Sequence, residues 1–552
     1  MTRVIVLVLT AVGFSLWPAT PVQAGPPSAT QACQPVSGTI TAGNNVWTTS
    51  GSCYTLSGTV TVPAGLTLTV GPDVTVQGNG SGAALLVRGR LVATGTAGHP
   101  ATFTGVTKSP ESWLGVRIES PDGSTLNSGS VLDNVVLEYG GYPNYTGNLV
   151  LDRASATVSN SLIQYGSRNG IATANGGSVN ASNSTFAYNG SGSTYAAIYL
   201  GDPNADSALA NLTLTDNANN AISIGGGTVS SSVRWRLPGA GVPYHLLGGI
   251  TVSSGGTLTI DPGVAVKHRF YGLVVNGTGR LYSIGTEAAP ISFSRIDPAT
   301  SWTGIAFDGT DVVPVAGSSI EWTAIDGAEN GISLDWATPL IRHVTVTNSE
   351  RYGIYSSYGS SPTITDTTVN GSNSFAYYFF NLTGNPALTN LTAAGNGASP
   401  GIGDTGNYNY NSVATWGHDV RADRTLTYSG LPYVELLGLS VQAGQTLTVH
   451  PGVELQFGSG RELKVWGQVV AAGTSAKPIL FTSNECSPKN VCTEEAKTPG
   501  WWNGITIDGY ESAPATGSVL DHVTVEYGGS AGYGEITTYW GQIAISNSVI
   551  RM

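Results

Sequence analysis

A short internal repeat constrains the fold of this chain more than any other feature of its sequence. The segments Ser159-Asn160-Ser161 and Ser182-Asn183-Ser184 are 183 − 160 = 23 residues apart. A related pattern begins at Ile341, Ile364 and Leu388, at spacings of 364 − 341 = 23 and 388 − 364 = 24 residues. Short apolar alternation follows each copy, and Gly, Asn, Asp or Pro then favours a turn. Periods of roughly 20–50 residues are typical of solenoids.

A coil of this length closes as three short strands joined by turns. Successive coils then stack at about 4.8 Å, each strand pairing in parallel with its counterparts above and below. We therefore expect an all-β, right-handed parallel β-helix with coils of about 23 residues. About 20 such coils would form a rod near 100 Å long, stabilised by contacts between neighbouring coils.

A second repeat divides the chain into three long blocks. They open at Tyr54, Tyr244 and Tyr433, at sequence offsets of 244 − 54 = 190 and 433 − 244 = 189. Each block also contains a Trp followed closely by Gly: Trp113-Leu-Gly115, Trp302-Thr-Gly304 and Trp501-Trp-Asn-Gly504. We expect an N-terminal cap region, 25–53, then blocks 54–243, 244–432 and 433–552, the last of them truncated. Features present three times are expected to be mostly scaffold.

One polar position recurs just before a strand in most coils, where the chain turns a corner. It is occupied by Asn134, Asn160, Asn183, Asn211, His343, Asp366, Asn390, His522 and Asn547, with Trp322 in the same place. Asn tolerates the left-handed conformation and bonds neighbouring backbone, so stacked copies form a ladder. With this ladder the chain resembles the bacterial parallel β-helix repeat proteins, whose fold is shared with pectate lyases. The resemblance covers almost all of the chain after its first residues and implies the fold far more than a function.

The composition narrows the class of partner. The chain has 23 basic and 35 acidic residues, for a net charge of −12. Nucleic acid is therefore not expected as a partner, because phosphate binding needs a basic face. Charged residues make up 11% of the chain, so hydroxyls and amides dominate the surface. Such a surface suits neutral sugars, and it equally suits a solenoid that binds nothing.

The N-terminus has the features of an export signal. Arg3 precedes an apolar run from Val4 to Trp17, and Val22-Gln23-Ala24 is a small-residue cleavage site. We expect residues 1–24 to be a signal peptide and the mature chain to begin at Gly25. No later segment approaches the ~20 apolar residues of a transmembrane helix. The predicted location is extracellular, including the cell surface and its matrix.

The four cysteines are expected to form disulfides, which persist outside the cytosol. Their positions favour the pairs Cys33–Cys53 and Cys486–Cys492, although sequence alone allows three connectivities. No nearby pair of His or Cys accompanies them at zinc-ligand spacing. We therefore predict no metal site.

Catalytic candidates are sparse. The resemblance implies a polysaccharide lyase, with Ca²⁺ held by carboxylates, or a glycoside hydrolase with paired carboxylates. The hydrolase motifs of this fold are absent from the sequence. The non-repeating segment 404–424 is the best place for a unique site, and it offers His418, Asp419, Arg421 and Asp423. It is equally well explained as a long surface loop.

Aromatic residues suggest a binding surface instead. The run Tyr377, Tyr378, Phe379 and Phe380 lies one coil beyond Tyr355 and Tyr358. Strand alternation turns about half of such a run outward, where ring faces can stack on sugars. Alternatively, loops cover these rings and they stack on one another.

The sequence thus favours an extracellular β-helix that binds carbohydrate or has an adhesive or structural role, without a cofactor. The alternative is a polysaccharide-degrading enzyme, a lyase or glycoside hydrolase, with Ca²⁺ in the lyase case.

Overall fold

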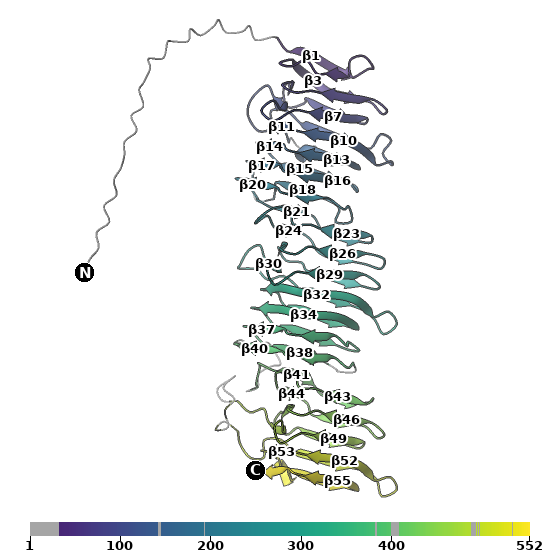
Figure 1. The fold of residues 1–552 in the computed structure, drawn as a ribbon, viewed down its shortest axis with the longest axis vertical. Helices are drawn as coiled ribbons and strands as arrows, with labels where there is room; N and C mark the ends of the chain where they lie inside the picture. The colour runs from purple at the N-terminus through teal and green to yellow at the C-terminus, as the bar shows by residue number, and fades with distance from the viewer. Residues whose placement is uncertain are drawn as a thin grey trace, which may run out of the picture.

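The computed structural model describes residues 32–141, 145–192, 194–380, 384–398, 408–486, 493, 495, 497–532 and 534–552. These residues form an all-β rod, in which parallel strands stack coil upon coil as a β-helix of about 20 turns (Figure 1). The predicted parallel β-helix is thereby confirmed. The predicted signal peptide, 1–24, lies outside the described residues.

The strands are short throughout. Those before the second block are β1 (Gln34–Thr39), β2 (Val46–Trp47), β3 (Cys53–Val62), β4 (Thr67–Val70), β5 (Thr75–Gly78), β6 (Ala84–Val87), β7 (Arg90–Thr94), β8 (Ala101–Gly105), β9 (Gly115–Glu119), β10 (Asn127–Asp133), β11 (Val135–Glu138), β12 (Gly147–Asp152), β13 (Ala154–Ser159), β14 (Leu162–Gln164), β15 (Asn169–Ala174), β16 (Ser178–Ser182), β17 (Thr185–Ala187), β18 (Ile198–Leu200), β19 (Leu209–Ala210), β20 (Thr213–Thr215), β21 (Ile222–Ile224), β22 (Gly227–Val229) and β23 (Ser232–Trp235).

The second block contains β24 (Tyr244–Leu246), β25 (Ile250–Val252), β26 (Thr257–Ile260), β27 (Ala265–His268), β28 (Leu273–Asn276), β29 (Arg280–Ile284), β30 (Ile291–Arg295), β31 (Ile305–Asp308), β32 (Val315–Asp326), β33 (Ile332–Asp335), β34 (Ala337–Thr347), β35 (Ile354–Ser357), β36 (Thr363–Thr365), β37 (Thr368–Asn370), β38 (Tyr377–Phe380), β39 (Ala387–Thr389), β40 (Thr392–Ala394), β41 (Val413–Trp416), β42 (His418–Val420) and β43 (Arg424–Leu426).

The third block contains β44 (Tyr433–Glu435), β45 (Leu439–Val441), β46 (Thr446–Val449), β47 (Glu454–Phe457), β48 (Glu462–Val465), β49 (Gln468–Ala472), β50 (Ile479–Ser483), β51 (Gly504–Asp508), β52 (Ala515–Asp521), β53 (Val523–Glu526), the 3-10 turn η2 (Ser530–Gly532), β54 (Ile536–Tyr539), β55 (Gly541–Ser546) and β56 (Val549–Arg551).

Strand alternation builds the core. Strands β4, β26 and β46 occupy the same place in the three blocks, and in each a half-buried Thr alternates with a buried aliphatic residue. Inward-facing residues from all three sides of the coil meet along the axis, where they form one continuous hydrophobic cluster. Because every side chain at an inward position is shielded by the coils above and below, short strands suffice to bury it.

The strand register confirms the predicted coil length. Ser155 pairs with Ser178 and Leu162 with Thr185, at sequence offsets of 178 − 155 = 23 and 185 − 162 = 23. Thr363 pairs with Ala387, at an offset of 387 − 363 = 24. The region 25–53, expected to be a cap, already contains coil structure, since β1 pairs with β3 and β2 with β4.

The ladder positions share one backbone conformation. All ten have positive φ between 46° and 53°: Asn134, Asn160, Asn183, Asn211, Trp322, His343, Asp366, Asn390, His522 and Asn547. Several bond one another between coils, as when the Asn211 amide donates to Asn183 Oδ1 over 3.2 Å. The His343 ring stacks on Trp322, with centroids 4.1 Å apart. The left-handed corner therefore explains why this position alternates among Asn, Asp, His and Trp.

The repeated Trp residues are scaffold. Trp113, Trp302 and Trp502 are at most 1% exposed. Trp302 stacks on His268 at 3.9 Å and Trp502 on Phe457 at 4.4 Å between ring centroids. Each indole fills the axial core beside the same turn of its own block.

The strands pair in the same way at both block junctions. The opening strand of the second block, β24, pairs with β21, which belongs to the column of strands that continues from β9. The opening strand of the third block, β44, pairs in the same way with β41, in the column that continues from β31. Matching corner loops of the three blocks project from one side of the rod, beside β10, β32 and β52 (Figure 1).

One disulfide secures the N-terminal coil. The predicted Cys33–Cys53 bond is present and joins β3 to the segment before β1. Cys486 is also disulfide-bonded; its predicted partner, Cys492, lies outside the described residues.

Candidate functional site

The aromatic run predicted to bind sugar is largely inaccessible. Tyr377 and Phe379 point into the axial core and are 0% and 1% exposed. Tyr378 faces outward but is 5% exposed, because Tyr352 and Tyr410 pack with it in a second hydrophobic cluster. The prediction of a sugar platform at these three residues is therefore wrong. Strand alternation was read correctly, but the chain around β41 folds over the outward face.

The remaining aromatic candidates divide into two kinds. Tyr355 and Phe380 lie partly buried against the same second cluster. Tyr358 is different, since it is 47% exposed and occupies a corner with φ 47°. It is the one member of the predicted set that presents a ring to solvent.

The catalytic candidates surround a small hollow of about 150 Å³. Arg421 forms an ion pair with Asp419, 2.7 Å between Nη2 and Oδ2. Asp423 accepts a hydrogen bond from the Thr446 amide over 2.8 Å. The structure brings these three residues together on an exposed edge; the side chain of His418 lies outside what it describes. Each carboxylate thus already has a partner.

A buried acid that the sequence did not suggest lines a second cavity, which shares Arg424 with this hollow. Glu435 is 3% exposed, lies on β44 and points into the solenoid. The Thr415 hydroxyl donates to it, and a cavity of about 20 Å³ that Arg424 also lines lies beside it. Burial raises the pKa of Glu435 to about 7, against the lowering effects of the Thr415 hydrogen bond and the Arg424 charge.

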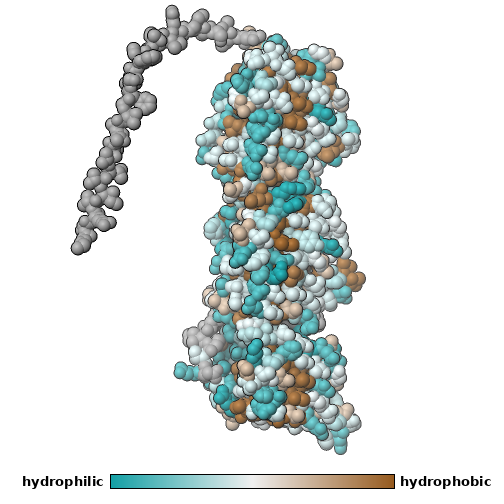
Figure 2. Space-filling view, in the orientation of Figure 1, coloured by the Kyte–Doolittle hydropathy of each residue, from teal (hydrophilic) through white to brown (hydrophobic). Residues whose placement is uncertain are grey.

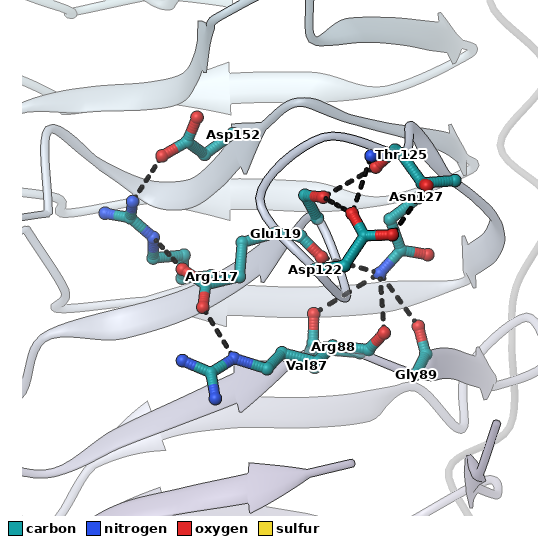
Figure 3. Close-up of polar contacts among 10 residues, drawn as sticks. Val87, Arg88, Gly89, Arg117, Glu119, Asp122, Thr125, Asn127 and Asp152 are labelled. Atoms are coloured by element: carbon teal, nitrogen blue, oxygen red, sulfur yellow. Dashed lines mark hydrogen bonds and ion pairs between the residues drawn. The ribbon is translucent and has the colours of Figure 1, made fainter. Parts of the chain in front are cut away.

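The first block has a polar cleft, a hollow of about 460 Å³. Figure 3 shows its ion-pair network. The Glu119 carboxylate accepts from Arg88 Nε over 2.8 Å and from Arg117 Nε over 2.9 Å. Arg117 also pairs with Asp152, which accepts from the Asn175 amide over 2.6 Å. Each charge is held by the coil before or after it, so the network is preorganised.

The loop that borders this cleft is rigid for a local reason. Asp122 accepts hydrogen bonds from the backbone amides and hydroxyls of Ser124 and Thr125, between 2.7 and 2.9 Å. These bonds hold the pKa of Asp122 well below its usual range. At the end of the loop, the Asn127 amide donates to the carbonyl oxygens of Gly89 and Glu119 over 3.0 and 2.9 Å. The loop is thereby tied to the coil before it (Figure 3).

A column of outward-facing residues, formed by the last residues of strands stacked on one another, recurs in all three blocks. Strand pairing aligns Glu119 with Asp152, Asn276 with Asp308 and Asp335, and Asp508 with Tyr539. A left-handed corner follows each column, with φ of 47° at Arg153, 46° at Trp336 and 51° at Trp540. The corner carbonyl accepts a bond from the strand after the loop each time: from the amides of Asn127, Val315 and Ala515, over 3.0 to 3.1 Å. The three sites are therefore copies of one design with different side chains.

In the second block the copy combines acids with aromatic rings. The rings of Trp336 and Tyr358 stack at an interplanar angle of 4°, with centroids 6.3 Å apart. Asp335 directly precedes Trp336 and pairs in register with Asp308. Burial and the Asp308 charge raise the pKa of Asp335, and its Oδ1 atom is buried without a hydrogen-bond partner. Gly359 lets the indole approach, because a Cβ there would lie 2.2 Å from Trp336 Cζ3.

In the third block the copy is more aromatic still. Tyr510 in the corner loop is 68% exposed, whereas Tyr539 and Trp540 lie in the last coil of the given sequence, where no further coil stacks on them. Lys464 pairs with Asp508 over 3.2 Å, and its ammonium lies 4.7 Å from the Trp466 ring centroid. Aromatic rings and an ion-paired carboxylate therefore lie beside the corner loop in this block as well.

Sequence reasoning missed Asp308, Asp335, Trp336 and the residues equivalent to them. The signal was available in the long repeat, because continuing the block alignment past Trp302-Thr-Gly304 brings Asp308 opposite Glu119 and Asp508. In the described ranges, no three His, Cys, Asp or Glu side chains are grouped so as to hold a metal ion. Across the same ranges, the structure contains no helix of the length and apolarity that membrane crossing requires.

Comparisons with known proteins give little further identification. No protein-family model matches the chain, and no solved structure matches it significantly. A stretch of 93 residues, 17% of this chain, is 30% identical to protein bark beetle of Drosophila melanogaster. That stretch corresponds to 3% of the fly protein, so the chain covers only a small part of that relative's length.

Proposed function

We propose that this chain is an extracellular β-helix protein that binds carbohydrate along one side of its rod, at a cell surface or in its matrix. The single observation that carries the proposal is the stacked pair Trp336 and Tyr358, which lies next to Asp308 and Asp335. Flat ring faces pack against the C–H faces of a pyranose, and carboxylates accept hydrogen bonds from its hydroxyls. The two features together match the two chemistries of a sugar ring.

Asp335 adds a carboxyl group to this site. Its side chain is partly buried directly before the Trp336 corner, and burial and the Asp308 charge raise its pKa. The Cys33–Cys53 disulfide supports an oxidising, extracellular location.

The test is retention of the full chain on a panel of immobilised polysaccharides, with and without Ca²⁺. We expect Trp336→Ala and Tyr358→Ala to lose retention on the glycan that holds the wild type. Tyr188→Ala is the matched control, since Tyr188 is 49% exposed, stacks on Tyr165 and lies at another left-handed corner. Retention that survives both Trp336→Ala and Tyr358→Ala would refute the assignment.

The alternative activity, polysaccharide degradation, has one observation in its favour. Asp308 and Asp335 are neighbouring carboxylates, and the raised pKa of Asp335 suits a group that gives up a proton. Assays for reducing ends and for unsaturated products on the same panel separate the two functions. Product formation that Asp335→Asn abolishes would make the chain an enzyme; retention without product supports binding.

A further inference from the structure

We infer that the first block binds an oxyanion carried on a sugar, a sulfate ester or a carboxylate, in the hollow that Arg88 and Arg90 line beside its corner loop. The inference goes beyond the proposed function, because it concerns another block and a charged ligand. The left-handed corner of this block is Arg153, where the second block has Trp336, so charged contacts take the place of the aromatic pair.

The hollow lies between the corner loop and the preceding coil and has a volume of about 410 Å³. Its lining consists of the turn 64–67, residues 88–90, Pro121 and residues 126–128. None of these described residues is Asp or Glu, so the charge of the lining comes from the two guanidinium groups. A pair of positive charges without an acid in the same hollow is a suitable environment for an anion.

Arg88 retains free donors although it is ion-paired. Its Nε atom donates to Glu119 over 2.8 Å, and its side chain is 49% exposed. Figure 3 shows the rest of the guanidinium group on the side away from Glu119. The Nη atoms form no hydrogen bond with any residue that the structure describes. They are therefore held in place and remain available to a ligand.

Arg90 is positioned by a bulge of the next coil. Gly129 has φ 87° and lies at the register shift in β10. A Cβ at Gly129 would lie 2.8 Å from Arg90 Nη2 and 2.9 Å from Nε, so the guanidinium group rests against this backbone. Within the described part of the chain, the Arg90 side chain has no hydrogen-bond or ion-pair partner. Its planar fork of donors matches two oxygens of one oxyanion.

The arginine pair is a property of the first block and not of the scaffold. In each block a glycine precedes the strand, and its Cβ would lie 2.1 to 2.3 Å from a carbonyl oxygen of the preceding coil: Gly89, Gly279 and Gly467. Aligned on that glycine, the positions of Arg88 and Arg90 hold Thr278 and Arg280 in the second block, and Trp466 and Gln468 in the third. The fold therefore forms without the pair.

The adjoining hollow adds to the positive charge. It shares Arg88 and is also lined by Arg153, which has no ion-pair partner in the described ranges. Its acids already accept hydrogen bonds, Glu119 and Asp152 from arginine and Asp122 from its own loop. Because the whole chain carries a net charge of −12, general attraction of polyanions is not expected. Binding of a polyanion would therefore report a local site.

The hollow also offers carbon surface for the body of a sugar. Pro121 and Leu126 line it beside the arginines, and Leu126 is 49% exposed. On the face shown in Figure 2, hydrophobic residues form small separate groups among hydrophilic ones. Two apolar side chains next to a charged pair match a single sugar ring with an anionic substituent better than a free ion.

The experiment measures retention of the full chain on dextran sulfate, carboxymethyl dextran and unmodified dextran, which share one backbone and differ in the charged group. We expect retention on a charged dextran and not on the unmodified one, weakening as salt concentration rises. The double variant Arg88→Ser, Arg90→Ser should bind the charged dextran roughly 10–100-fold more weakly. Arg90→Lys keeps the charge but loses the planar fork, so its affinity should lie between the two.

Arg280→Ser is the matched control, since Arg280 rests against Gly317 in the second block, 3.3 Å from Nε to the Cβ position, beside Thr278 instead of a second arginine. Circular dichroism checks that every variant keeps the β-helix. Stronger retention on dextran sulfate identifies a sulfate ester, and stronger retention on carboxymethyl dextran identifies a carboxylate.

Equal retention of the wild type and the double variant, or an equal loss in Arg280→Ser, would overturn the inference. Absence of retention on both charged dextrans would do the same. Trp336→Ala should leave retention on the charged dextrans unchanged, so failure of this inference and failure of the proposed function are distinguishable.

Discussion

The buried acid Glu435 should make the junction between the second and third blocks sensitive to pH. Burial raises its pKa from the usual 4.5 to about 7. The folded state therefore binds a proton between these two values that the unfolded state has released. The stabilising contribution of the protonated acid is complete below pH 4.5 and is lost as the pH rises through 7.

The structure gives the size of this effect. Each pKa unit corresponds to about 1.4 kcal/mol, so the ionised carboxylate costs the folded junction about 3 kcal/mol above neutral pH. Three other groups face Glu435, namely Thr415, Arg424 and Tyr433. Glu435→Gln keeps the size of the side chain and its contact with Thr415 but cannot ionise. The difference between wild type and variant therefore isolates the titration of this one group.

Hydrogen exchange measures the effect where it acts, because a long solenoid does not unfold as one unit. Between pH 4 and pH 8 the protection of β41 and β44 should fall on the order of 10²-fold more in the wild type than in Glu435→Gln. Glu454→Gln is the control, since Glu454 on β47 is partly exposed and accepts from Gln456. A wild-type to Glu435→Gln difference that does not change with pH would refute the reasoning.

Three further substitutions test the scaffold. Trp113→Ala leaves a cavity in the axial core and should cost about 3–5 kcal/mol in chemical denaturation, and a loss below about 1 kcal/mol would contradict that packing. Burial lowers the pKa of His268 from 6.5 to about 4, so the fold should lose stability as the pH falls between these values. His268→Phe, the residue type of Phe457 in the third block, should reduce that acid sensitivity in thermal melts and leave the part due to His245, whose pKa burial also lowers to about 4; an unchanged pH slope would disprove it. Replacing Cys33 and Cys53 by Ser should cost about 3 kcal/mol and speed exchange in β1, and unchanged exchange there would contradict a stabilising role.

The coil and its ladder were predictable because a left-handed corner restricts the residue that occupies it. Asn183, His343 and Asp366 differ in charge and size, yet all tolerate or stabilise positive φ. Such residues recur once per coil, and apolar alternation follows each of them. This combined pattern predicts the solenoid, which hydrophobicity by itself would not.

The aromatic site was mispredicted because local periodicity says nothing about what covers a strand. Tyr378 faces outward, but it is buried in one cluster with Tyr410, which follows only after β39 and β40. Conversely, Trp336 lies at a corner, where no alternation rule applies. Only the pairing of coils reveals that Asp308 and Asp335 are neighbours. Glu435 was hidden for a related reason, since a single Glu in a short strand gives no sign of which way it faces.

Hydroxyl-radical footprinting of the full chain, with and without the retained polysaccharide, tests the central claim most directly. We expect the ligand to protect Trp336 and Tyr358 from oxidation and to leave Tyr188 and Tyr271 unchanged. Tyr271 is a suitable reference because it is 56% exposed and lies outside the repeated column. Protection confined to other residues, or equal oxidation with and without ligand, would contradict the claim that this side of the rod binds carbohydrate.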